Sequence, residues 1–158
     1  MKFIKELLKV YAVFVAIFFI GRVFFYLIYF DRLSDISLNE SLLTFIFGLR
    51  MDTIVISIIL VIPAIFLTLT PKIFSKFISK FLYFYILLFI VIALFIESAS
   101  FPFFAQYDLK PNYLFIEYLE YPKEVTSLLF KDYKLEFIFA SILIFLVSKI
   151  YLKLNFIN

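Results

Sequence analysis

Residues 43–70 read LTFIFGLRMDTIVISIILVIPAIFLTLT, and only Arg50 and Asp52 carry charge in this run. A helix needs roughly 20 predominantly apolar residues to cross the hydrocarbon core of a bilayer. The run therefore predicts a transmembrane helix, with its extra length taken up by tilt or by interfacial first turns. Pro63 should kink this helix, because proline lacks the N–H that a helix interior uses.

Three further apolar stretches flank this run. They cover residues 10–30, 81–104 and 137–152. The first follows three lysines like a signal peptide, but its apolar run exceeds the usual signal core of about 7–15 residues. The last is short and contains Lys149, whose ammonium can reach the headgroups. The sequence predicts an all-α, polytopic membrane helix bundle of about four transmembrane helices, forming one domain over residues 1–158.

The composition supports a membrane protein and excludes several kinds of site. Of the 158 residues, 65% are hydrophobic and 17% are charged, whereas soluble domains are about half apolar and a quarter charged. Cysteine and histidine are absent, which excludes disulfides, thiol nucleophiles, histidine catalysis and Cys/His metal sites. The net charge of +3 is divided among short segments, so we expect no nucleic-acid binding.

Lysine positions predict the orientation. Lys2, Lys5 and Lys9 precede the first span, and lysines also occupy the connection between the second and third spans and the end of the fourth. Positively charged connections favour the cytoplasmic side. We therefore expect both termini in the cytoplasm. The heavy use of Phe, Ile, Leu, Tyr and Lys indicates a bacterial source, so the expected location is the bacterial cytoplasmic (inner) membrane.

The outer loop, residues 105–136, shows helical patterning. Asn112 can cap a helix in which Phe115 and Tyr118 share an apolar face and Glu117 lies on the opposite face. Pro122 interrupts this pattern, and a second apolar stripe follows. We expect two short amphipathic helices, which either lie on the outer membrane surface or pack over the mouth of the bundle.

Four ionisable residues fall inside the apolar spans: Arg22, Arg50, Asp52 and Glu97. A lone charge at mid-bilayer costs roughly 2.5–3.5 kcal/mol on insertion scales, so we expect partners. The hypothesis pairs Arg22 with Glu97, and Arg50 with Asp52 or a lipid phosphate. Such a cluster can fix helix register, bind a lipid headgroup through an arginine fork, or conduct protons or ions.

Several motifs then carry a family resemblance. They are Arg22, GLRMD at 48–52, residues 97–104, YDLKPNYLFIEYL at 107–119 and YPKEV at 121–125. Together they resemble the N-terminal membrane domain of the lipoteichoic-acid-synthase-like family. Members of this family are bacterial phosphoglycerol and phosphoethanolamine transferases whose catalytic domain has the sulfatase fold.

The resemblance implies a five-helix membrane domain leading into an external catalytic domain with a threonine nucleophile and a divalent metal. That domain would move a phospholipid headgroup onto a cell-envelope lipid or glycan. Residues 1–158 contain four spans and no such domain, so we expect a truncated or split transferase. In this chain we expect no catalytic residue, metal or cofactor, only bilayer contacts and a headgroup site. The alternative is a self-standing membrane scaffold or a transporter subunit.

Overall fold

A computed structural model describes residues 2–33, 37–111, 113–121, 123, 127 and 130–154. Helices dominate this part of the chain, in the order α1 (Lys2–Ile28), α2 (Phe30–Leu33), α3 (Leu38–Leu69), a 3-10 turn η1 (Lys72–Phe74), α4 (Ser75–Tyr107), α5 (Tyr113–Leu119) and α7 (Lys134–Leu154). No strand is assigned among these residues. The predicted all-α class is confirmed.

Four of these helices are long and apolar enough to cross a membrane: α1, α3, α4 and α7. At most 28% of the residues in their apolar windows are buried, so most of the apolar surface faces outward. Water would not tolerate so much exposed apolar surface, whereas lipid tails do. The chain is therefore a multi-pass membrane protein. Each spanning helix begins several residues before the apolar stretch that predicted it, because polar residues such as Lys5 and Lys76 extend the first turns.

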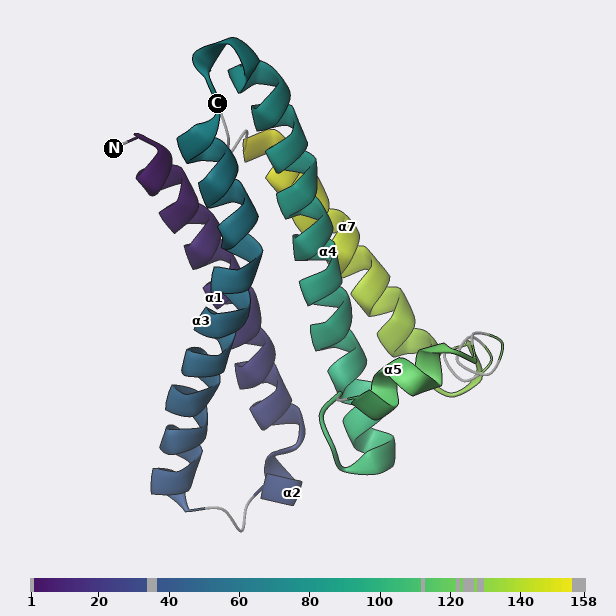
Figure 1. The fold of residues 1–158 in the computed structure, drawn as a ribbon. Helices are drawn as coiled ribbons and strands as arrows, with labels where there is room; N and C mark the ends of the chain where they lie inside the picture. The colour runs from purple at the N-terminus through teal and green to yellow at the C-terminus, as the bar shows by residue number, and fades with distance from the viewer. Residues whose placement is uncertain are drawn as a thin grey trace. The chain divides into compact units, whose positions relative to one another are not determined.

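The chain forms two compact units. One contains Met1–Ile90 and the C-terminal end from Leu154, and the other contains Val91–Lys153. In the first unit α1 and α3 run antiparallel and pack side by side (Figure 1). Phe14 of α1 and Ile56 of α3 are fully buried there, and so is Leu82 in the first half of α4.

The start of α3 is fixed by a capping box. The backbone N–H of Glu40 donates to Ser37 Oγ at 3.3 Å, and the Ser37 N–H donates to the Glu40 carboxylate at 3.0 Å. These two bonds satisfy backbone donors that the first helical turn leaves unpaired. The helix thus begins five residues earlier than the apolar run indicated.

Pro63 lies inside α3 and is fully buried. Because proline has no N–H, the carbonyl of Ile59, four residues earlier, loses its normal helical partner. The hydroxyl of Tyr85 on α4 donates to that carbonyl at 3.0 Å. In lipid, backbone polar groups must be satisfied within the protein, so this bond replaces what the proline removed.

In the second unit, the C-terminal half of α4 is followed by α5. Asp108 ends α4 with a positive φ of 54°, a left-handed conformation that lets the chain turn. The Phe115 ring of α5 packs edge-on against Phe103 of α4, at 5.5 Å between centroids, while Tyr113 and Ile116 stay exposed. One of the two expected short loop helices is therefore present; Asn112 and most of the second expected helix lie outside the described residues.

Tyr85→Phe removes only the hydroxyl that bonds the Ile59 carbonyl. Leaving that carbonyl unsatisfied should lower the free energy of unfolding by roughly 1–3 kcal/mol. In a Pro63→Ala background the restored N–H can serve Ile59, so the same change should cost much less. SDS titration of all four proteins in detergent micelles measures this; an equal cost in both backgrounds would refute the explanation.

Candidate functional site

An ion pair joins α1 to α3. The Nη2 of Arg22 donates to both carboxylate oxygens of Asp52, at 2.9 and 2.8 Å. Both side chains are mostly buried, with 14% and 13% of their surfaces exposed. Charge-assisted bonds of this kind are stronger than neutral ones, and removal of one partner would strand a buried charge. The pair therefore fixes how α1 lies along α3.

Gly48 makes room for the arginine. A Cβ placed on Gly48 would stand 2.6 Å from both Nε and Nη2 of Arg22, and it would also collide with Cζ. The guanidinium thus lies directly against the α3 backbone, one helical turn before Asp52. Small residues allow this close approach between membrane helices.

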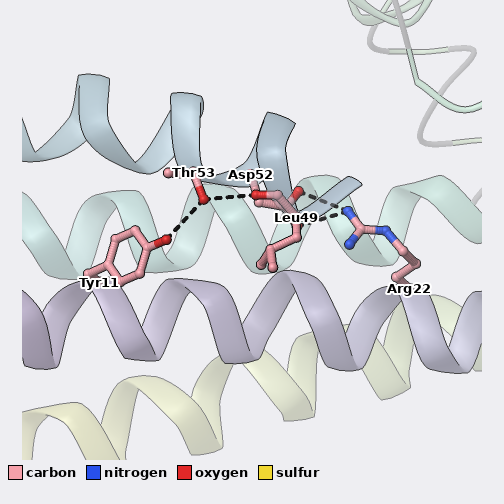
Figure 2. A network of polar contacts seen from close by, with 5 residues as sticks. All are labelled: Tyr11, Arg22, Leu49, Asp52 and Thr53. Carbon is pink, nitrogen blue, oxygen red and sulfur yellow. Dashed lines mark hydrogen bonds and ion pairs between the residues drawn. The ribbon is translucent and has the colours of Figure 1, made fainter. Parts of the chain in front are cut away.

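Two neutral contacts continue the same interface. The hydroxyl of Tyr11 lies 2.9 Å from Thr53 Oγ1, and Thr53 in turn donates to the Leu49 carbonyl at 2.8 Å (Figure 2). Since the single Thr53 proton is used in that bond, Tyr11 is the donor to Thr53. Tyr26 and Ser41 approach to 3.4 Å further along the helices. We call these contacts, with Arg22–Asp52, the polar seam.

Arg50 does not pair with Asp52, so that part of the pairing hypothesis is wrong. Residues two apart on a helix point to different sides, and Asp52 faces Arg22 on α1. Arg50 is exposed and has no ion-pair partner among the described residues. The alternative partner for Arg50, a lipid phosphate, stays a prediction.

The remaining predicted site residues belong to the second unit or the loop. Glu97 is half-buried on α4 within that second unit, so its expected pairing with Arg22 stays a prediction. Glu117 is exposed on α5, and Tyr118 lies in the same helix. Asn112 lies outside the described residues.

The sequence reasoning missed Gly48, Tyr11 and Thr53 as site residues. The spacing of Gly48 and Asp52 by four residues places them on one helix face, and this was the available signal. Nothing in the sequence indicated which tyrosine would reach Thr53.

The charges in and near the polar seam indicate what kind of ligand this site could bind. Arg22 and Asp52 neutralise each other, and Nη1 of Arg22 is buried without an acceptor among the described residues. Within the same part of the chain, no group of three metal-ligating side chains gathers. The charged donors that stay accessible near the polar seam are the guanidinium N–H groups of Arg50, which is exposed. Such donors suit an oxyanion.

Comparison with known proteins adds no family assignment. No protein-family model matches the chain, and no solved structure matches it. The membrane class and the polar seam rest on the sequence and structure themselves.

Gly48→Ala adds a methyl group where the Arg22 guanidinium lies. It should lower the free energy of unfolding by roughly 1–3 kcal/mol, the usual range for overpacking, despite the better helix propensity of alanine. In an Arg22→Ala background the space is vacant, so the added methyl should be neutral or stabilising. SDS titration measures both effects, with Gly21→Ala, the chain's other glycine, as the control. An equal cost of Gly48→Ala in both backgrounds would contradict the proposed role of Gly48.

Proposed function

We propose that this chain is the membrane-anchoring and headgroup-docking domain of a cell-envelope transferase. The enzyme would belong to the lipoteichoic-acid-synthase-like family, and its sulfatase-fold catalytic domain would transfer phosphoglycerol or phosphoethanolamine. The four apolar helices hold the chain in the membrane, and the chemistry is supplied by a catalytic domain outside residues 1–158.

One observation supports this proposal most. Arg22, Gly48 and Asp52 carry part of the family resemblance, and they come from two different helices. In the structure they form one site, with Arg22 against Gly48 and bonded to Asp52. A chance likeness among scattered residues gives no reason for them to meet.

The charges near the polar seam support the docking role. Because Arg22 satisfies Asp52, no net negative charge from this pair repels an anionic headgroup. Arg50 then remains as an exposed cation on the same helix. A guanidinium binds phosphate oxygens in a two-pronged geometry.

The proposal places the chain in the bacterial cytoplasmic membrane with its N-terminus inside. Each crossing reverses the side, so the start of α3 lies outside and the connection between α3 and α4 lies in the cytoplasm.

Single-cysteine labelling tests this orientation cleanly, because the chain has no native cysteine. In intact spheroplasts a membrane-impermeant maleimide should label Asn39→Cys and leave Ser75→Cys unlabelled; both sites are exposed in the structure. Permeabilisation should then make Ser75→Cys reactive. Labelling of Ser75→Cys before permeabilisation would show that the orientation is the opposite of the proposed one.

The DNA sequence around the end of this reading frame tests the transferase assignment. We expect the reading frame beyond codon 158, or an adjoining gene in the same transcript, to encode a further apolar span. A soluble domain with a threonine nucleophile and Asp, Glu and His metal ligands should follow. If neither place encodes such a domain, the assignment is wrong, and a self-standing scaffold or transporter subunit takes its place.

A further inference from the structure

Arg50 is a charge on the outward side of α3. Its neighbours at helical spacing, Ile46, Phe47 and Ile54, are exposed, with 63%, 55% and 48% of their surfaces accessible. The guanidinium therefore lies among apolar side chains that lipid would contact. An anion supplied from outside the protein would stabilise a cation in such surroundings, and no described acidic residue forms an ion pair with Arg50.

The depth of Arg50 along α3 fits the phosphate level of a bilayer. Arg50 precedes Thr70, the C-cap of α3, by twenty residues, and η1 begins two residues later at Lys72. At 1.5 Å per residue this distance is about 30 Å, the thickness of the hydrocarbon core. If the lysine-bearing end of α3 lies at one interface, Arg50 lies at the other. The first turns of α3 then pass through the headgroup layer.

An apolar stripe descends from Arg50 on the same face of α3. Ile54, Ile58, Val61 and Ile65 follow at steps of three or four residues, so they align with Arg50. Ile58 has 67% of its surface exposed, and the others about half. Arg50 to Ile58 spans about 12 Å, most of one leaflet. A cation above an apolar stripe matches the shape and polarity of a phospholipid.

We propose that Arg50 and this stripe bind one anionic phospholipid, with the lipid phosphate on the guanidinium and an acyl chain along Ile54 and Ile58. A lipid without a headgroup amine fits best, because Arg22 already neutralises the charge of Asp52, the nearest acid on α3. The site deepens the headgroup-docking part of the proposed function. It does not depend on the presence of a catalytic domain.

Native mass spectrometry of the whole chain in detergent tests the binding. Added phosphatidylglycerol should be retained at one molecule per chain, and more tightly than phosphatidylcholine. Arg50→Gln should weaken its retention about tenfold, the loss of one charge-assisted contact. Lys76→Gln removes an exposed lysine in the first turn of α4 and should leave the retention of phosphatidylglycerol unchanged. Equal retention in the two variants, or no preference over phosphatidylcholine, would overturn the proposal.

Depth is a second, independent readout that leaves Arg50 in place. Nitroxide labels on Met51→Cys and Ile58→Cys should differ by about 10 Å in depth, with the Met51 label near the phosphate level. A Met51 label near the bilayer centre would overturn the proposal. The reading frame beyond codon 158 affects neither measurement, so failure of the transferase assignment and failure of the lipid site remain distinguishable.

Discussion

The rest of the first unit depends on the ion pair in which Nη2 of Arg22 donates to both carboxylate oxygens of Asp52. Both side chains are mostly buried, so either charge without the other would be costly, whereas the pair is neutral. The pair requires Gly48 at the contact point, and it sets which residues of α1 and α3 meet elsewhere. The Tyr11–Thr53 contact is compatible with that alignment. One electrostatic requirement thus fixes the register of a whole helix pair.

A second constraint comes from the backbone. Lipid offers no hydrogen bonds, so every carbonyl that a helix fails to satisfy needs another donor. Tyr85 meets this need by donating to the carbonyl of Ile59, four residues before Pro63. Hydroxyls such as that of Ser57 also bond to the carbonyl four residues earlier. With its internal polar groups satisfied in this way, α3 presents one exposed cation, Arg50, to its surroundings. That division between paired interior charge and unpaired outward charge underlies the proposed lipid site.

The sequence predicted the helical class and the four spans because long apolar runs have few alternatives. It also placed Arg22 and Asp52 at similar depth. The partner that it offered for Asp52, Arg50, was wrong, because Asp52 pairs with Arg22. Sequence spacing shows that Arg50 and Asp52 are neighbours along the chain, yet their directions differ by more than half a turn. The contact with Arg22 depends on how two helices dock, and an apolar pattern does not encode that. The early start of α3 could have been read from Ser37 and Glu40, whose spacing is that of a capping box.

The central claim is that Arg22 and Asp52 stabilise the fold only as a pair. A double-mutant cycle with Arg22→Met and Asp52→Leu tests it most directly, by SDS titration of the free energy of unfolding. Each single change leaves a buried charge without a partner and should cost about 3–5 kcal/mol, whereas the double variant should be more stable than either single variant. Additive losses, with the double variant the least stable, would contradict the account.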